Sequence, residues 1–288
     1  MMHKFVILLR SLYGYILKWA YDLRWLRVPA LGERQQSDVI VSLTSYGRRV
    51  QEGVVCYSIY SILRQTRQPK RIILWLSEIE WNDTNLPQKV AALRNKGVEI
   101  LYCEDMKSYK KLLPTIALCP DESIITIDDD ILYPCVLIAE LSEAHRQFPQ
   151  AIIAPSMYQP VRTENGYTPY LTWPFDTPEQ PTLFLFPMGG TGCWYPPHCL
   201  KKEMLNYTLA QQFAPNADDV WFWAAGIANK TLKYRTKWTY HLISFDAIYQ
   251  YTHRGSALQH SNVKGNALTN DMQIAATINY IKEQYGTR

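Results

Sequence analysis

The chain has 288 residues, of which 47% are hydrophobic and 19% charged, so it can form one large domain or two small ones with a substantial core. Its formal net charge is +4, and residues 1–32 carry five Lys and Arg against one Asp, which accounts for the whole excess. The balanced remainder argues against a nucleic-acid-binding body, which needs a basic face, and the six cysteines lack the spacing of a zinc site.

Residues 1–32 are predicted to form a basic amphipathic helix. Their longest apolar run is residues 5–9, whereas a membrane span needs about 20 residues. On a helix, one side carries Phe5, Leu8, Leu9, Leu12, Tyr15, Ile16, Trp19, Leu23 and Leu26. This pattern favours a helix lying in a membrane interface. The alternative is a helix docked on the protein's own core or on a partner subunit. Pro29 and Gly32 end the helix, and a linker follows.

From residue 38 onward, apolar strands alternate with segments of helical spacing. Strands are expected at 38–43, 71–76, 98–103, 123–127 and 151–155, with helices at 54–65, 87–97, 108–118 and 135–148. The short helical stretch at 108–118 is expected to break at Pro114. This alternation predicts an α/β domain over 38–288, with a mostly parallel sheet flanked by helices.

The stretch "SIITIDDDILYP" places three carboxylates directly after a buried strand. Asp128, Asp129 and Asp130 repel one another, and each raises the pKa of its neighbours. Ligands bind beyond the carboxyl ends of the strands in an open parallel sheet, where the polar turn "TSYGRR" also lies. Mg²⁺ and Mn²⁺ take carboxylate and phosphate oxygens, so the triplet predicts a metal-phosphate site.

The usual phosphate loops, GxxxxGK[ST] and a GxGxxG after the first strand, do not occur. A strand that ends in Asp-x-Asp after three strand-helix units resembles a nucleotide-sugar glycosyltransferase of the GT-A fold, and family-2-like bacterial enzymes are the most similar. "VSLTSYGRR" and "VVCYSIYSILRQTRQPKRIILWL" resemble their opening unit. The resemblance covers about 39–230 and implies a Rossmann-related GT-A-like fold. Its nucleotide-binding half would be 38–135, and 136–288 would form the acceptor half and a C-terminal cover.

The resemblance implies that Asp130 binds the metal, with Asp128 at the ribose or beside the metal. For Asp129 the resemblance does not decide between contact with the nucleotide and contact with the metal. The end of the first strand would receive the base, which makes Thr44, Ser45 and Tyr46 candidates. Lys110 and Lys111 match a place where such enzymes keep a basic residue near the nucleotide, although an exposed helix face is the alternative.

A second carboxylate pair, Asp218 and Asp219, precedes an apolar helix at "VWFWAAGIA". One aspartate is explained as an N-terminal cap. In inverting members of the resembled family, an acidic pair about 90 residues after the triplet supplies the general base. The resemblance therefore implies Asp219 as the base and Asp218 as its support.

Two further segments are candidates for ligand contact. The glycines of "FLFPMGGTGCWYPP" allow close backbone approach, or they form a turn between strands. Flat faces suited to sugar rings, or else to the core, are offered by Trp173, Trp194, Tyr195 and Trp221. In the tail, the resemblance implies His260 as a third metal ligand with Lys264 over the diphosphate, or His253 with Arg254. An exposed loop histidine is the alternative.

Together these features predict a Mn²⁺- or Mg²⁺-dependent glycosyltransferase. It would move a sugar from a nucleoside diphosphate donor, a UDP-sugar, to a hydroxyl of a glycan or lipid-linked acceptor in surface glycan synthesis, such as lipopolysaccharide or capsule. The basic helix and the reduced thiols place it in the cytoplasm, peripheral at the inner face of the membrane. The first alternative is a metal-dependent phosphohydrolase or nucleotidyltransferase using Asp128 and Asp130. The second is a non-enzymatic, membrane-associated glycan-binding module.

Overall fold

The structure is a computed structural model that describes residues 12–13, 16, 19–20, 22–23, 27–164, 166–175, 178–237, 243–244 and 269–286. A seven-stranded sheet lies at its centre, in the order β12-β6-β11-β4-β1-β2-β3. Its strands are β1 (Gln36–Thr44), β2 (Gln68–Ser77), β3 (Val98–Cys103), β4 (Ser123–Thr126), β6 (Ile152–Ala154), β11 (Cys193–Tyr195) and β12 (Lys233–Arg235). Only β11 runs antiparallel within this sheet, so the predicted mostly parallel sheet is confirmed.

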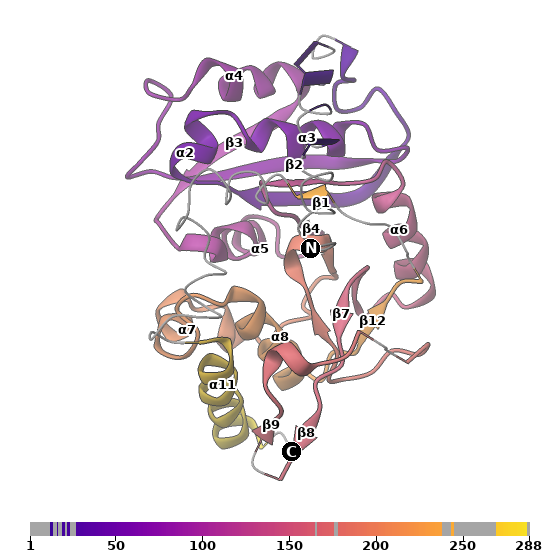
Figure 1. The fold of residues 1–288 in the computed structure, drawn as a ribbon, viewed down its shortest axis with the longest axis vertical. Helices are drawn as coiled ribbons and strands as arrows, with labels where there is room; N and C mark the ends of the chain where they lie inside the picture. Colours follow the sequence, from indigo (N-terminus) through magenta and orange to yellow (C-terminus); the bar gives the residue numbers. More distant parts are fainter. Residues whose placement is uncertain are drawn as a thin grey trace.

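Helices cover both faces of the sheet (Figure 1). They are α2 (Gly47–Gln51), α3 (Val55–Leu63), α4 (Gln88–Ala91), α5 (Leu113–Leu118), α6 (Leu137–Gln147), α7 (Tyr207–Phe213), α8 (Asp218–Ala228) and α11 (Asn270–Tyr285). The first three lie in the upper part of Figure 1 with β1–β3, and the last three lie in the lower part. Small strand pairs are formed by β5 (Ile131–Leu132), β7 (Met157–Tyr158), β8 (Arg162–Thr163), β9 (Gly166–Tyr167), β10 (Phe186–Pro187) and β13 (Ile243–Ser244).

Successive residues of the central strands face two different cores. Ile124 of β4 joins one hydrophobic cluster, whereas Ile125 joins the other. The same alternation separates Ile152 from Ile153 in β6. Side chains alternate across a strand, and both faces of a mostly parallel sheet are covered. This explains why the strands are continuous apolar runs in the sequence.

Two predicted helices differ in detail from those observed. The helix expected at 87–97 divides into α4 and a 3-10 turn, Ala92–Lys96, which ends at Gly97 in the left-handed region (φ 82°). The stretch at 108–118 divides into the 3-10 helix η3 (Lys107–Lys111) and α5. Pro114 lies in the first turn of α5, where its missing N–H costs little, so it starts a helix there.

The N-terminal helix lies mostly outside the described residues, although positions 12, 13, 16, 19, 20, 22 and 23 are helical. The chain is packed onto the body from Val28, which is 3% exposed. Leu31 N–H donates to the Lys96 carbonyl at 2.8 Å, and Gly32 N–H donates to Gln68 Oε1 at 2.9 Å. The predicted tail residues His253, Arg254, His260 and Lys264 lie outside the described residues.

Candidate functional site

The site lies where β1 and β4 end side by side. Ser42 of β1 pairs with Thr126 of β4 in parallel register, so the residues after both strands reach the same edge of the sheet. Because β11 runs antiparallel and pairs Cys193 with Thr126, the residues before β11 reach this edge too. These residues include the 3-10 helix η5 (Gly189–Thr191). Three segments far apart in the sequence therefore meet here.

Two of the three triplet carboxylates are bound by the segment after β1. Ser45 Oγ donates to Asp129 Oδ2 at 2.5 Å, and Arg49 Nη1 lies 2.5 Å from Asp129 Oδ1. Arg49 Nη2 also lies 3.1 Å from Asp130 Oδ2. Asp129 and Asp130 are buried, at 4% and 9% exposure, so Arg49 offsets part of their mutual repulsion.

Asp128 is the triplet residue that faces outward. Its side chain is 39% exposed, and Lys111 Nζ lies 3.3 Å from its Oδ1. The Tyr133 hydroxyl fixes the backbone at this point, because it accepts from Asp128 N–H at 2.8 Å and donates to the Gly190 carbonyl at 2.5 Å. Asp128 is thus held at a defined place while its carboxylate remains reachable from solvent.

Lys111 also contacts the second carboxylate pair. Its Nζ lies 3.0 Å from Asp218 Oδ2 and 3.7 Å from Asp219 Oδ1, both in the first turn of α8. The two acidic clusters, about 90 residues apart in sequence, therefore lie around one lysine. The Lys111 side chain is only 6% exposed, so this contact lies inside the protein. The sequence reasoning proposed both clusters and Lys111, but not that the lysine joins them.

The backbone of Gly189 and Gly190 lies between the two carboxylate clusters and close to both. A Cβ on Gly189 would lie 2.3 Å from Asp219 Oδ1, and one on Gly190 would lie 2.1 Å from Asp128 Oδ2. Real Cβ atoms do not approach an oxygen this closely, so any side chain here would displace a carboxylate. The predicted close approach of this backbone is made to the protein's own carboxylates.

Burial and charge act in opposite directions on the ionisable groups. Burial favours the neutral form of Lys111, but Asp128, Asp218 and Asp219 outweigh it and raise the pKa of this lysine. Burial raises the pKa of Asp219 to about 7, and Asp218 and Asp128 add to this although Lys111 opposes it. Among the described residues, no well-formed hydrogen bond reaches the buried Asp219 Oδ1, while the Asp219 side chain as a whole is 33% exposed. The exposed part is open to a substrate.

The charge of the site suits an additional cation. Five carboxylates face the two basic side chains of Arg49 and Lys111. Asp218 Oδ2 has Lys111 Nζ at 3.0 Å, but no well-formed hydrogen bond reaches the buried Asp219 Oδ1 within the described residues. A divalent ion would relieve this excess of negative charge. No group of three His, Cys, Asp or Glu among the described residues is arranged to hold one. Water and phosphate oxygens would have to complete its coordination, as is common for Mg²⁺.

Other predicted residues are placed as follows. Thr44 Oγ1 donates to the Trp75 carbonyl at 2.9 Å and joins β1 to β2. Tyr46 is 40% exposed, and the Arg49 guanidinium lies 5.5 Å from its ring centre. Lys110 is buried and pairs with Asp105 instead of the triplet. The aromatic candidates for sugar stacking are at most 4% exposed and belong to the core, namely Trp173, Trp194, Tyr195 and Trp221.

Sequence reasoning missed two residues that build the site. Arg49 was part of the noted turn "TSYGRR", but a single arginine in a polar turn carries no signal of its partner 80 residues away. Tyr133 follows the triplet in "ILYP", where a tyrosine is indistinguishable from a core residue. The sequence did indicate that a basic partner such as Arg49 was needed, because three adjacent buried carboxylates require a counter-charge.

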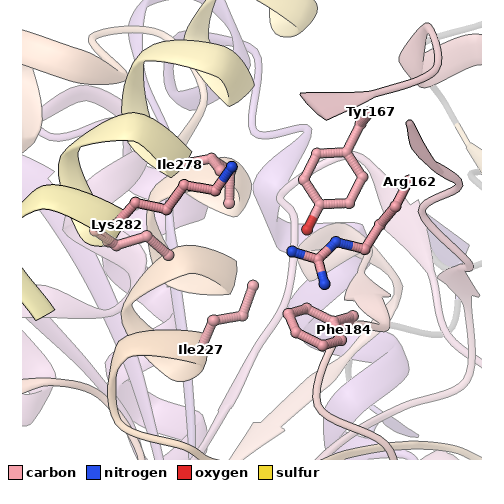
Figure 2. Close-up of a pocket in the computed structure, with 7 residues that line it drawn as sticks. Arg162, Tyr167, Phe184, Ile227, Ile278 and Lys282 are labelled. Atoms are coloured by element: carbon pink, nitrogen blue, oxygen red, sulfur yellow. The ribbon is translucent and has the colours of Figure 1, made fainter. Parts of the chain in front are cut away.

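A separate small pocket lies at the other end of α8. It is lined by Arg162, Tyr167, Phe184, Ile227, Ile278, Ile281 and Lys282. Figure 2 shows the Arg162 guanidinium beside Phe184, 4.8 Å from its ring centre. Ile227 is eight residues after Asp219, or about 12 Å along the helix, so this pocket is distinct from the carboxylate site. Its cavity volume of about 10 Å³ is far below the ~300–1,000 Å³ of typical ligand sites.

No protein-family model and no curated protein matches the chain. Three of the similar solved structures are weak matches. Residues 1–349 of S. aureus TarS are 12% identical, with 88% of this chain and 72% of that chain covered at a TM-score of 0.45. A Pyrobaculum calidifontis mannosyltransferase bound to GDP-Man and Mn²⁺ is 14% identical, with 80% of this chain and 64% of that chain covered at a TM-score of 0.43. The UTP-bound UGPase of Acinetobacter baumannii is 9% identical, with 88% and 95% covered and a TM-score of 0.42. These similarities are too weak to assign a function.

Proposed function

We propose that the protein is a nucleotide-sugar glycosyltransferase that transfers a sugar from a nucleoside diphosphate donor to an acceptor hydroxyl. One observation carries the proposal: the Asp128–Asp130 triplet and the Asp218–Asp219 pair meet around Lys111 at the carboxyl edge of the sheet. Ligands bind at this edge in open α/β sheets. A diphosphate group and a sugar would lie between a cluster suited to phosphate and a carboxylate suited to proton transfer.

Asp219 is proposed as the general base. In the transfer, the acceptor oxygen forms a bond to the anomeric carbon, the bond from that carbon to the diphosphate breaks, and the hydroxyl proton passes to Asp219. Its partly exposed side chain can meet the hydroxyl, and a raised pKa suits a base that works near neutral pH. Asp218 and Lys111 would hold Asp219 in place, and the lysine charge would also face the departing diphosphate.

The donor nucleoside is proposed to lie beside Tyr46. The hydroxyls of Thr44 and Ser45 are already engaged by Trp75 and Asp129. The half-exposed ring of Tyr46 therefore remains the candidate for contact with the base.

A divalent ion, Mn²⁺ or Mg²⁺, is proposed as the cofactor, with Asp128 and Asp130 as its ligands and His260 and Lys264 closing the site from the tail. When bound, the ion would neutralise the diphosphate. The surplus of carboxylates over basic groups supports it. A UDP-sugar donor and a lipid-linked or surface glycan acceptor are the substrates that we propose from the sequence resemblance.

The test is to incubate the full-length protein with UDP- and GDP-sugars, with and without Mn²⁺, and to identify the released nucleotide by chromatography. Transfer or slow hydrolysis at the anomeric carbon releases the nucleoside diphosphate. A phosphohydrolase would instead release the monophosphate, and a nucleotidyltransferase given pyrophosphate would form the triphosphate. Either of the last two products would replace our proposal with that activity.

Thermal shift with the same donors tests the site. Asp130→Asn should abolish the Mn²⁺-dependent stabilisation by donor, while circular dichroism shows an intact fold. Asp121→Asn is the matched control, because this aspartate is 83% exposed and, among the described residues, forms its ion pair with His198 outside the site. If no nucleotide-sugar donor stabilises the wild type in the presence of any divalent metal ion, the protein is not an enzyme of this class. A binding module then becomes the better explanation.

A further inference from the structure

The described positions of the N-terminal helix present a stripe of exposed apolar side chains. Leu12, Ile16, Trp19 and Leu23 are 57%, 54%, 65% and 66% exposed. At about 100° per residue, the spacing of these four positions places them within about 60° of one another around the helix. We call these four residues the apolar stripe. Single exposed apolar residues are ordinary, but four on one line mark an interaction surface.

Asp22 fixes this helix to the body on another side. Its Oδ1 lies 2.9 Å from the Tyr57 hydroxyl and 2.7 Å from Lys89 Nζ. Lys89 Nζ also lies 4.2 Å from the centre of the Tyr57 ring. On a helical wheel Asp22 is about 90° from the centre of the stripe, so docking through Asp22 turns the stripe away from the body.

The pairing of Asp22 with Lys89 also changes the charge balance of residues 1–32. Asp22 is the single acidic residue of residues 1–32, against five Lys and Arg. Its charge is paired with Lys89 of the body. With Asp22 paired, the remaining charged residues of the segment are all Lys or Arg, and they accompany the apolar stripe.

We propose that the apolar stripe binds the surface of an anionic lipid bilayer, independently of the reaction proposed above. Trp, Leu and Ile on one line with surrounding basic residues match a helix that lies in the interface of an anionic membrane. A protein partner would not require the excess of positive charge. Among the described residues no helix is long and apolar enough to cross a membrane.

The experiment is co-sedimentation of the full-length protein with vesicles of phosphatidylcholine alone or with phosphatidylglycerol. Binding should require phosphatidylglycerol and should weaken as salt rises, because salt screens the electrostatic part. Leu23→Glu should weaken vesicle binding about tenfold or more, because it places a charge where an apolar side chain would be buried. Leu171→Glu is the matched control, since Leu171 is 68% exposed in the other half of the chain. It should bind as the wild type does.

Both variants change exposed residues, so both should keep the wild-type melting temperature, which makes the comparison one of binding alone. No sedimentation with anionic vesicles would overturn the proposal, as would equal loss in the two variants. The oligomeric state in solution provides a further arm. If Leu23→Glu converts an oligomer to a monomer but leaves vesicle binding unchanged, the stripe binds a second copy of the chain instead of lipid.

Discussion

Lys111 joins the two carboxylate clusters, because its Nζ lies within 4 Å of Asp128, Asp218 and Asp219. A buried lysine is costly unless it is paired, and buried carboxylates are costly without a positive neighbour. Each side of this contact therefore depends on the other. The single lysine has two consequences that can be separated, one for stability and one for the ionisation of Asp219.

The stability consequence concerns Lys111→Met, which keeps most of the side-chain volume and removes the charge. We expect the free energy of unfolding to fall by about 3–5 kcal/mol near pH 8, the usual cost of removing one partner of a buried pair. Without the lysine, the native carboxylates bind protons more readily than in the unfolded chain. The variant should therefore recover stability as pH falls toward 5.

Urea unfolding at both pH values measures this effect. Lys107→Met is the control, because Lys107 is exposed and, within the described part of the chain, its amino group hydrogen-bonds to the Pro215 carbonyl and to Asn216. It should change stability by about 0.5 kcal/mol or less at either pH. An equally small change in Lys111→Met would mean that Lys111 does not neutralise the carboxylates.

The ionisation consequence concerns the pH dependence of turnover. Burial raises the pKa of Asp219 to about 7, so its carboxylate, the form that accepts a proton, is populated above that pH. We expect kcat/KM to rise about tenfold per pH unit below pH 7 and to level off above it. Asp219→Asn should lower kcat about 10²-fold or more, should remove this slope and should leave donor affinity almost unchanged.

Steady-state rates over pH 5–9 and donor binding measure both parts of this prediction. A loss confined to KM, or a variant with near-normal turnover, would reduce Asp219 to a cap of its helix. The carboxylates themselves were predictable, since three aspartates after an apolar strand and two before an apolar helix stand out in the sequence. Arg49 and Tyr133 were not, because their roles exist only through contacts with distant residues.

At the level of elements, strands β1–β4 and β6 were predictable as apolar runs, whereas the antiparallel strand β11 was not. The strand expected at 98–103 matches β3, and those expected at 38–43 and 71–76 lie inside β1 and β2. β11 has only three residues and runs antiparallel between β4 and β6. Nothing in its sequence indicates that position, yet it brings η5 to the site. A tripeptide carries too little periodicity to specify its neighbours.

The approach of η5 to the triplet can be tested at Gly190. Gly190→Ala would place a methyl group 2.1 Å from Asp128 Oδ2, so either the carboxylate or the turn must move. We expect a destabilisation of about 1–3 kcal/mol, as for overpacking, and loss of donor binding. In an Asp128→Ala background the clash is absent, and the same change should cost much less.

Thermal unfolding of the wild type, both single variants and the double variant provides the coupling energy. The destabilisation of the double variant should be smaller than the sum for the two single variants by about 1 kcal/mol or more. Additive effects would show instead that Gly190 serves the backbone of the turn and not the approach of Asp128.

For the whole molecule, the order of the strands decides which residues meet. The alternation of strands and helices predicted a parallel sheet, but not that β1 lies between β4 and β2. Strand order depends on packing between distant segments, and the local periodicity does not contain it. The convergence of the two acidic clusters follows from this order, so it could be proposed only through a resemblance.

The boundary between helix and body belongs to the same scale. The sequence favours a break near residue 32, but the chain is already packed onto the body at Val28, which lies in the main core. Lys96 Nζ donates to the Val28 carbonyl at 2.6 Å, and Gln68 Nε2 donates to the Ala30 carbonyl at 3.0 Å. Removing residues 1–32 therefore uncovers core and leaves the Lys96 and Gln68 donors without these acceptors. Removing residues 1–26 keeps Val28 and Ala30 and, among the described contacts, loses those of Asp22 with Tyr57 and Lys89.

We expect the free energy of unfolding of a chain lacking residues 1–26 to lie within about 2 kcal/mol of that of the full-length protein. Among the described contacts it loses the partly exposed Asp22–Lys89 ion pair and the hydrogen bond from the Tyr57 hydroxyl to Asp22. A chain lacking residues 1–32 should lose about 3–6 kcal/mol more, from the buried Val28 side chain and the four hydrogen bonds that Val28, Ala30, Leu31 and Gly32 make with the body. Urea unfolding of the three proteins measures the difference. Equal stability of the two truncated chains would return the boundary to residue 32, because the contacts of Val28 and Ala30 would then contribute nothing to the fold. The shorter truncation also provides a folded body without the apolar stripe, in which donor binding should persist while binding to anionic vesicles is lost.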